Sequence, residues 1–262
     1  MSRLDEARKA YQKKDVEGVR KAHERKRIES EPWHDLVRGR RIKDVIYASS
    51  DGIVTTFAVV AGATGAMLSS TIIIILGFAN LLADGFSMAI GDYLGTKSEI
   101  EYFKKEKERE AWEVEHIPDA EREEVRWIFR KKGLIPQFAD KLVEIITSDK
   151  KVWTEFMMTE ELGLVSEEKS SPFKAALATF SAFIAAGFMP LLFFALSYAF
   201  VITNTFTLSV ITTAVSLFIV GTLRARVTRR NWLRSSLEVL AGGGAAAIVA
   251  YLIGFLLRAL VG

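Results

Sequence analysis

The distribution of charge constrains this chain more than any other feature of its sequence. Three stretches contain no lysine or arginine: residues 44–96, 175–223 and 235–257. Half of the 262 residues are hydrophobic and yet 26% are charged, so the charge is concentrated between these stretches. Because an α-helix needs about 20 apolar residues to cross the hydrocarbon of a bilayer, the pattern predicts an all-α membrane protein with a sizeable polar part.

The apolar stretches are long enough for five transmembrane helices. The predicted helices cover residues 44–66, 71–95, 175–198, 204–223 and 236–257. Pro190 predicts a kink within the third helix, since proline removes one backbone hydrogen bond. The predicted parts of the chain are an amino-terminal arm (1–43), helices one and two (44–96), a helical domain (97–174) and helices three to five (175–262).

The basic residues predict the orientation of the helices. With five spans, residues 1–43, 97–174 and 224–234 lie on one side and hold 34 of the 35 lysines and arginines. The basic side is cytoplasmic by the positive-inside rule, so the amino terminus and residues 97–174 are predicted to be cytoplasmic and the carboxyl terminus outside. The first 43 residues are polar, which argues against a cleavable signal peptide. Cysteine is absent, which excludes disulfides and thiolate metal sites.

Polar side chains inside the predicted spans are the first functional candidates. Asp51 lies in the first apolar stretch, and no lysine or arginine follows it until Lys97. A carboxylate at the centre of a bilayer costs about 2.5–3.5 kcal/mol on insertion scales, so an intramembrane acid is a functional candidate by default. At about 1.5 Å per residue, Asp51 and Met88 lie roughly 10 Å and 12 Å from the same side, so the two are predicted to be level.

The second span carries a polar stripe on one helical face. Asn80, Asp84, Met88 and Asp92 recur every four residues. Oxygen and thioether ligands together suit a transition metal better than Na⁺ or Mg²⁺, so the stripe is predicted to line a metal path. Other interpretations stay open: Met88 could be a packing residue, Asn80 could bond a neighbouring helix, and Asp92 could be solvated near the interface.

The polar block 97–174 carries a second candidate metal site. Glu106, Glu110 and Glu113 share one helical face by their spacing, and the sequence "IPD" (117–119) breaks that helix, with Asp119 a predicted cap for the next one. Glu121 and Glu124 stand three residues apart on the following helix. Glu-x-x-Glu pairs on consecutive helices bind metals in some helical bundles. The alternative is a solvated helix with many ion pairs, because lysine and arginine alternate with these acids.

Two further features accompany these acids. Met157 and Met158 stand one turn before Glu161 in "FMMTEEL". Two adjacent thioethers are more often core residues than ligands. In the last span, Gly242, Ala246, Ala250 and Gly254 form a stripe of small residues, which predicts a helix-packing face.

These motifs together resemble the vacuolar iron transporter family of plants and yeast and its prokaryotic relatives. The motifs that carry the resemblance are "SDGIVTTFAVVAGATGA", "FSMAIGDYLGTKSE", the Glu-rich segment with "IPD", and "WTEFMMTEELGL", in this order. The resemblance covers roughly residues 38–262 and leaves the amino-terminal arm outside. Plant members tend to carry a glutamate where this chain has Asn80, and here the acid is Asp84, one turn further on.

The resemblance implies a fold, a function and a set of site residues. It implies a five-span homodimer with its pore at the dimer interface, exporting Fe²⁺, and often Mn²⁺, from the cytosol in exchange for protons. A cytoplasmic helical metal-binding domain lies between helices two and three. Asp51 and Met88 match the membrane metal site, and the matching cytoplasmic ligands are Glu110, Glu113, Glu121, Glu124, Met157, Met158 and Glu161.

The remaining expectations concern partners and rival functions. Metal ions and protons are the expected substrates and lipid the expected surroundings; no enzyme activity, no cofactor and no nucleic-acid partner is expected. The cell membrane is the expected location, because the chain is prokaryotic in style. Two alternative functions would use the same features. One is a membrane-anchored di-iron oxidase, and the scarcity of histidine argues against it. The other is a metal-sensing membrane protein, and the intramembrane acids argue against it.

Overall fold

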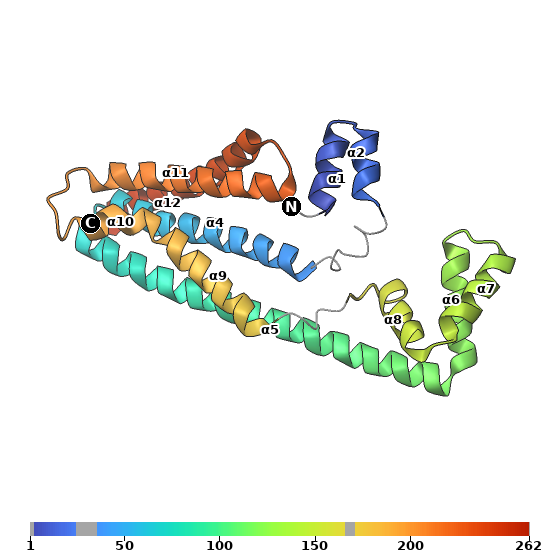
Figure 1. Cartoon of the computed structure of the whole chain (residues 1–262). Helices are drawn as coiled ribbons and strands as arrows, with labels where there is room; N and C mark the ends of the chain where they lie inside the picture. Colours follow the sequence, from blue (N-terminus) through green and yellow to red (C-terminus); the bar gives the residue numbers. More distant parts are fainter. Residues whose placement is uncertain (1–2, 25–35, 166–170, 262) are drawn as a thin grey trace. The chain divides into compact units, whose positions relative to one another are not determined.

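The computed structural model describes residues 3–24, 36–165 and 171–261, and all regular structure in these residues is helical. The chain divides into two units, residues 1–39 and 40–262. The helices are α1 (Arg3–Gln12), α2 (Val16–Ala22), α4 (Leu36–Gly65), α5 (Ser70–His116), α6 (Pro118–Lys131), α7 (Pro136–Thr147), α8 (Lys150–Glu160), α9 (Pro172–Gly187), the 3₁₀ turn η1 (Met189–Leu191), α10 (Leu192–Leu196), α11 (Thr205–Thr228) and α12 (Trp232–Val261) (Figure 1).

Five helical segments are long and apolar enough to cross a membrane, which confirms the predicted number. They are Ile42–Gly65, Ser70–His116, Pro172–Leu196, Thr205–Thr228 and Trp232–Arg258. Large apolar side chains such as Ile75, Ile211 and Ile248 are more than half exposed on their outer surfaces. Such an apolar exterior is stable in lipid and unfavourable in water.

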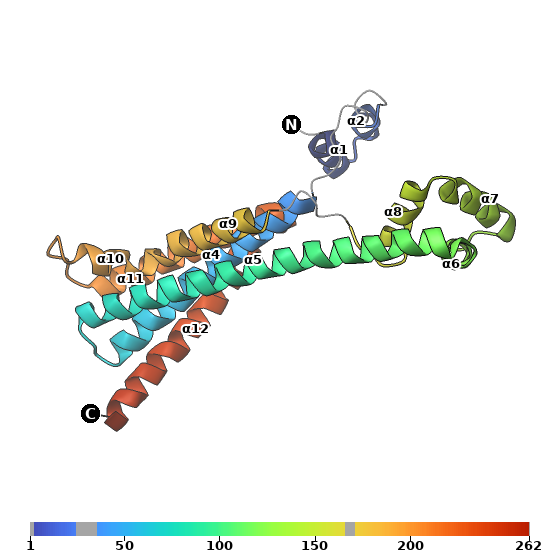
Figure 2. The same cartoon turned by 90° about the horizontal axis from the view of Figure 1, so that it is seen from below.

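The second helix is much longer than the predicted span of residues 71–95. Helix α5 continues without interruption for 47 residues, which is about 70 Å. Residues 96–116 contain neither proline nor glycine and are rich in Glu, Lys and Arg, which are good helix formers, so nothing ends the helix at the predicted boundary. Figures 1 and 2 show α5 passing from the bundle of α4, α9 and α11 to the helices α6–α8. One continuous helix therefore carries members of both groups of predicted site residues.

The third span is bent, as Pro190 predicted. Helix α9 ends at Gly187, and Pro190 lies in the 3₁₀ turn η1 before α10 begins. The carbonyl of Pro190 accepts a hydrogen bond of 2.5 Å from the hydroxyl of Ser209, which is fully buried on α11. A side chain of the next span thus satisfies a backbone group at the bend.

The last span packs on α4 through small residues, two of which belong to the predicted stripe. A Cβ atom added at Gly254 of α12 would collide with the carbonyl of Gly62 on α4, so the two backbones touch at this crossing. Gly243 contacts Leu217 and Val54 closely, whereas Gly242 faces open space. Of the predicted stripe, Ala250 and Gly254 therefore pack on Gly62 of α4, whereas Gly242 does not pack on the described part of this chain. The adjacent Gly243 packs instead, because several small residues here are adjacent in sequence.

Helices α6–α8 and the distal part of α5 form a helical subdomain, residues 97–165, with its own apolar core. The core is built by Val114, Val125, Ile128, Phe129, Ala139, Val143, Trp153 and Met157. Asp149 caps α8 by accepting hydrogen bonds of 2.9 Å from two backbone amides. Asp119 is not a cap, contrary to the prediction: α6 begins at Pro118, so Asp119 already lies in the first helical turn, where it pairs with Arg122.

The amino-terminal unit contains the hairpin of α1 and α2. The two helices bury Ala7, Ala10 and Ala22 against each other, and Asp15 caps α2 by accepting a hydrogen bond from the amide of Gly18. Residues 25–35 of the predicted arm lie outside the described residues, as do residues 166–170 of the predicted polar domain.

Candidate metal centre

Three acids of the subdomain meet where α5 turns into α6. One carboxylate oxygen from each of Glu110, Glu113 and Glu121 lies within 4.8 Å of the other two. The break at Ile117 changes the direction of the chain, and acids of the two helices lie close together on either side of it. We call these three residues the acidic cluster. Among residues 3–24, 36–165 and 171–261, these three are the acids that lie close enough together to share one ion.

Two members of the acidic cluster are buried and incompletely bonded. Glu110 is 0% exposed and Glu121 is 3% exposed. One oxygen of each carboxylate, Oε2, is buried without a hydrogen-bond partner. A buried polar atom without a partner costs about 1–3 kcal/mol, and more when the group is charged. The residues therefore fit a bound cation, which would supply the missing interaction for both oxygens.

The electrostatics of the cluster follow from this burial. Burial, followed by repulsion from Glu161, raises the pKa of Glu110 to about 7. Burial, followed by repulsion from Glu110, raises the pKa of Glu121 to about 7. Burial, followed by repulsion from Glu124, raises the pKa of Glu161 as well. Glu124 and Glu161 therefore act on the same electrostatic site, although they do not belong to the closest group of three.

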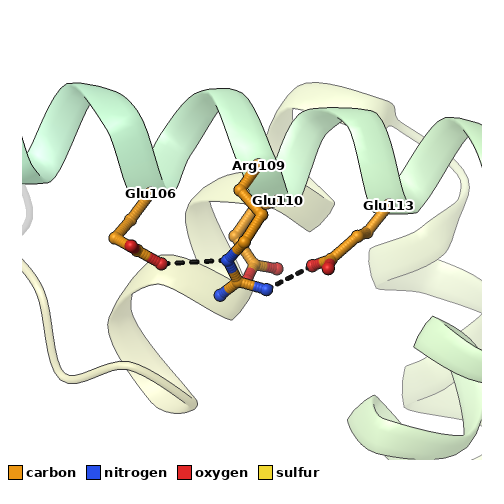
Figure 3. A network of polar contacts seen from close by, with 4 residues as sticks. All are labelled: Glu106, Arg109, Glu110 and Glu113. Carbon is orange, nitrogen blue, oxygen red and sulfur yellow. Dashed lines mark hydrogen bonds and ion pairs between the residues drawn. The ribbon is translucent and has the colours of Figure 1, made fainter.

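The other predicted cytoplasmic ligands lie around this cluster in different roles. Met157 is fully buried and packs in the apolar core of the subdomain, and Met158 is 2% exposed. Both are on α8, which packs against α5. Glu106 lies one turn before the cluster and pairs with Arg109, whose Nε is 2.9 Å from Glu106 Oε2 (Figure 3). Arg109 also pairs with Glu110 and Glu113, a contact set that the pattern of acids did not reveal.

The chain matches the VIT family over residues 42–255. It belongs to this family. It is 35% identical to the "Vacuolar iron transporter" of Toxoplasma gondii, over 99% of this chain and 90% of that protein. It is 32% identical to the "Vacuolar iron transporter" of Plasmodium berghei over 98% of this chain and 97% of that protein. With "Vacuolar iron transporter 1" of Arabidopsis thaliana the identity is 32%, over 81% and 84% of the two chains.

Membership of the VIT family confirms the predicted resemblance and extends it. The matches to the Toxoplasma and Plasmodium proteins include nearly the whole chain, and thus the amino-terminal arm that the sequence motifs left outside. The names of these relatives denote transporters and not enzymes, in agreement with the expectation of no enzyme activity.

In this VIT family chain the polar stripe of α5 is half-buried. Asn80, Asp84, Met88 and Asp92 all have intermediate exposure. The amide of Asn80 donates a hydrogen bond of 3.0 Å to Asp84, so these two side chains form a pair along the helix. Asp84 also lies near enough to Asp51 of α4 for their carboxylates to repel. Met88 packs against the buried cluster that includes Leu81 and Phe183, which agrees with a packing role and leaves a metal role untested.

A polar cavity lies at the end of this stripe. Its volume is about 620 Å³, and it is lined by Lys43, Asp44, Tyr47, Ser87, Met88, Gly91, Asp92, Gly95, Thr96, Glu99 and Thr179. Asp92 accepts a hydrogen bond of 2.6 Å from Thr179 on α9, so it is bonded to protein and not merely solvated. The sequence motifs missed Asp44, Glu99 and Thr179. The spacing of Asp92 and Glu99, two turns apart, was an available signal, but nothing in the sequence pairs Asp92 with Thr179.

Proposed function

We propose that this VIT family chain exports Fe²⁺, together with Mn²⁺ and similar divalent ions, from the cytosol in exchange for protons. The observation that carries this proposal is the acidic cluster, in which two buried carboxylates have unpartnered oxygens. The relatives named vacuolar iron transporters support iron as the cargo. Helix α5 supports transport over simple binding, because it joins the cluster to the polar residues of the apolar region.

The subdomain is proposed to be a cytoplasmic domain that collects metal ions. Its proposed ligands are Glu106, Glu110, Glu113, Glu121, Glu124, Met157, Met158 and Glu161. Carboxylate oxygens bind hard and borderline cations, and thioethers favour transition metals, so the combination suits Fe²⁺ and Mn²⁺ better than Mg²⁺. Excess negative charge around the cluster raises the local concentration of cations.

The membrane part is proposed to carry the translocation site. Asp51 and Met88 are its proposed ligands, with Asp84 and Asn80 contributing from the same half-buried stripe. In a homodimer with the pore at the interface, two copies of each ligand face a shared path. Carboxylates must lose protons to bind metal, so metal binding and proton release are coupled.

The proposed topology follows from the basic residues. The amino terminus and residues 97–174 are cytoplasmic and the carboxyl terminus is outside. The cell membrane is the proposed location, and the relatives named above are vacuolar by their names. The cell membrane and the vacuolar membrane both border the cytosol, so transport out of the cytosol has the same direction across either membrane.

Metal flux in proteoliposomes tests this proposal directly. The purified chain is reconstituted with a pH reporter and a metal reporter inside the vesicles, and Fe²⁺ is added under anaerobic conditions. We expect metal uptake accompanied by proton movement in the opposite direction. Fe²⁺ oxidation without flux would contradict the proposal in favour of a di-iron oxidase, and binding without flux would favour a metal sensor.

The pH dependence of metal binding provides a second test. Because the pKa values of Glu110 and Glu121 are about 7, both carboxyls are mostly protonated at pH 6, and a metal must displace two protons. Two such displacements raise the apparent affinity about 100-fold between pH 6 and pH 8. Titration of the full chain with Mn²⁺ at several pH values measures this slope. A flat profile would show that these two carboxyls are not ligands.

A further inference from the structure

Arg109 holds three carboxylates of the candidate metal centre at once. Its Nε lies 2.9 Å from Glu106, its Nη2 lies 2.6 Å from Glu110, and its Nη1 pairs with Glu113. All three nitrogens of the guanidinium are therefore used, each by a different acid. Figure 3 shows the guanidinium between Glu106 and Glu113, on the side of α5 from which Glu110 projects.

This arrangement is more than the ordinary pairing of helix neighbours. Spacings of three and four residues explain the contacts with Glu106 and Glu113. The contact with Glu110 is different, because adjacent residues on a helix point about 100° apart and do not face each other. The Arg109 side chain must bend toward the side chain of Glu110, which is only 1% exposed. The charge of Arg109 thus reaches a buried member of the acidic cluster.

A guanidinium in this position competes with a metal ion. Glu110 and Glu113 belong to the acidic cluster, and each gives an oxygen to Arg109. Arg109 uses Oε1 of Glu110 and leaves Oε2 of the same carboxylate without a partner. A divalent ion bound at these carboxylates is therefore close to the guanidinium and is repelled by its positive charge. The side chain of Arg109 is 41% exposed, so the guanidinium has direct access to water. It can leave the carboxylates without any movement of a helix.

We infer that Arg109 is a displaceable internal counter-ion, which holds Glu110 and Glu113 when no metal is bound and moves to solvent when a divalent cation takes them. This inference rests on the proposed function of the cluster as a metal site. Arg109 is a positioning residue and not a metal ligand. Its competition lowers the affinity of the cluster and speeds release, as a domain that passes its ion to a pore requires.

Titration of the full chain in detergent with Mn²⁺ tests this inference. Free Mn²⁺ is measured by its electron paramagnetic resonance signal at pH 8. A Glu110→Gln, Glu121→Gln variant reports the Mn²⁺ that binds elsewhere on the chain. We expect Arg109→Gln to bind Mn²⁺ at the cluster at least about tenfold more tightly than the wild type, and Arg109→Lys to lie between them, because lysine keeps the charge but not the fork of three nitrogens.

Arg126 offers a matched control. It pairs with Glu123 and Asp140 on the same subdomain, but neither acid belongs to the acidic cluster. Arg126→Gln should leave Mn²⁺ affinity within about twofold of wild type, since only surface ion pairs of small effect are lost. Unchanged or weaker binding by Arg109→Gln would overturn the inference while the wild-type binding still supports the metal site. No saturable cluster binding by the wild type would overturn the site and this inference with it.

A direct measurement on Arg109 separates displacement from a purely structural role. The Nε–H resonance of Arg109 in ¹⁵N-arginine-labelled protein is assigned by its loss in Arg109→Gln. We expect saturation of the cluster with diamagnetic Zn²⁺ to shift this resonance and to speed its exchange with water at least about tenfold, because the bond to Glu106 is lost. A resonance that stays protected at saturation would show that the guanidinium remains in place, and would overturn the inference.

Discussion

Replacement of Asp51 by asparagine is expected to lower metal flux in proteoliposomes by at least about 100-fold. Asp51 is half-buried on α4 within an apolar span, and the polar stripe of α5 lies near it. Asparagine keeps the shape but removes the negative charge that a divalent cation needs in a medium of low dielectric. A loss of 100-fold corresponds to about 2.7 kcal/mol of activation free energy. This is close to the cost of one uncompensated charge on membrane-insertion scales.

The protein itself should survive this change, which makes the result interpretable. Removal of an intramembrane charge does not add a desolvation cost, so the thermal stability of Asp51→Asn should not fall. Glu238→Gln makes the same chemical change on α12, where the exposed carboxylate pairs with Arg224. We expect this control to keep flux within about twofold of wild type. Wild-type flux by Asp51→Asn would remove Asp51 from the translocation path.

The second large effect is expected from the double variant Glu110→Gln, Glu121→Gln. Metal binding at the acidic cluster should weaken by at least about 100-fold, since two buried anionic ligands become neutral amides. The metal-free protein should become more stable at the same time. The two effects have opposite signs, so a general loss of structure cannot produce both.

The sign of the stability change follows from the pKa values. Both carboxyls have a pKa of about 7 in the folded chain against an ordinary value of 4.5. The folded state therefore binds more protons than the unfolded state between these values, and stability falls as the pH rises through this window. At pH 8 both groups are charged, buried and mutually repelling. Their neutral replacements should add about 2 kcal/mol, or about 4–8 °C in Tm, when no metal is present.

Thermal unfolding with and without Mn²⁺ at pH 8 measures both effects. The wild type should gain stability with Mn²⁺, as any ligand of the folded state requires, and the double variant should not. Glu108→Gln, Glu123→Gln is the matched control, because these exposed acids lie on the same two helices. A double variant that is less stable than wild type without metal would show that the two carboxylates are structural.

Several particular features could be predicted because they depend on local sequence alone. The five spans follow from apolar length, and the bend of the third span follows from Pro190. The meeting of Glu110 and Glu121 was predicted from two spaced acid pairs on either side of a helix break, and the structure brings them together with Glu113. The ligand role of these acids stays a prediction until metal is measured.

Other features were predicted incorrectly from the sequence, and each error has a physical reason. The predicted boundary near residue 96 was placed by hydropathy, but hydropathy does not end a helix, and α5 continues through it. Asp119 resembled a cap, but proline is favoured at the first helical position, so α6 begins at Pro118 and Asp119 lies inside its first turn. On α12, Ala250 and Gly254 of the predicted face pack on α4, but Gly242 does not, because adjacent glycines and alanines fit several registers equally well.

The membrane-spanning class of this chain, the number of its spans and the residue types available for metal chemistry could all be established without a structure. These properties depend on the composition and residue spacing of each helical segment, and not on its neighbours. The burial of Glu110 and Glu121 with unpartnered oxygens and the hydrogen bond between Asp92 and Thr179 arise from the packing of several helices. Burial and hydrogen bonding between helices depend on which helices pack together, and the sequence of one helix does not specify its neighbours.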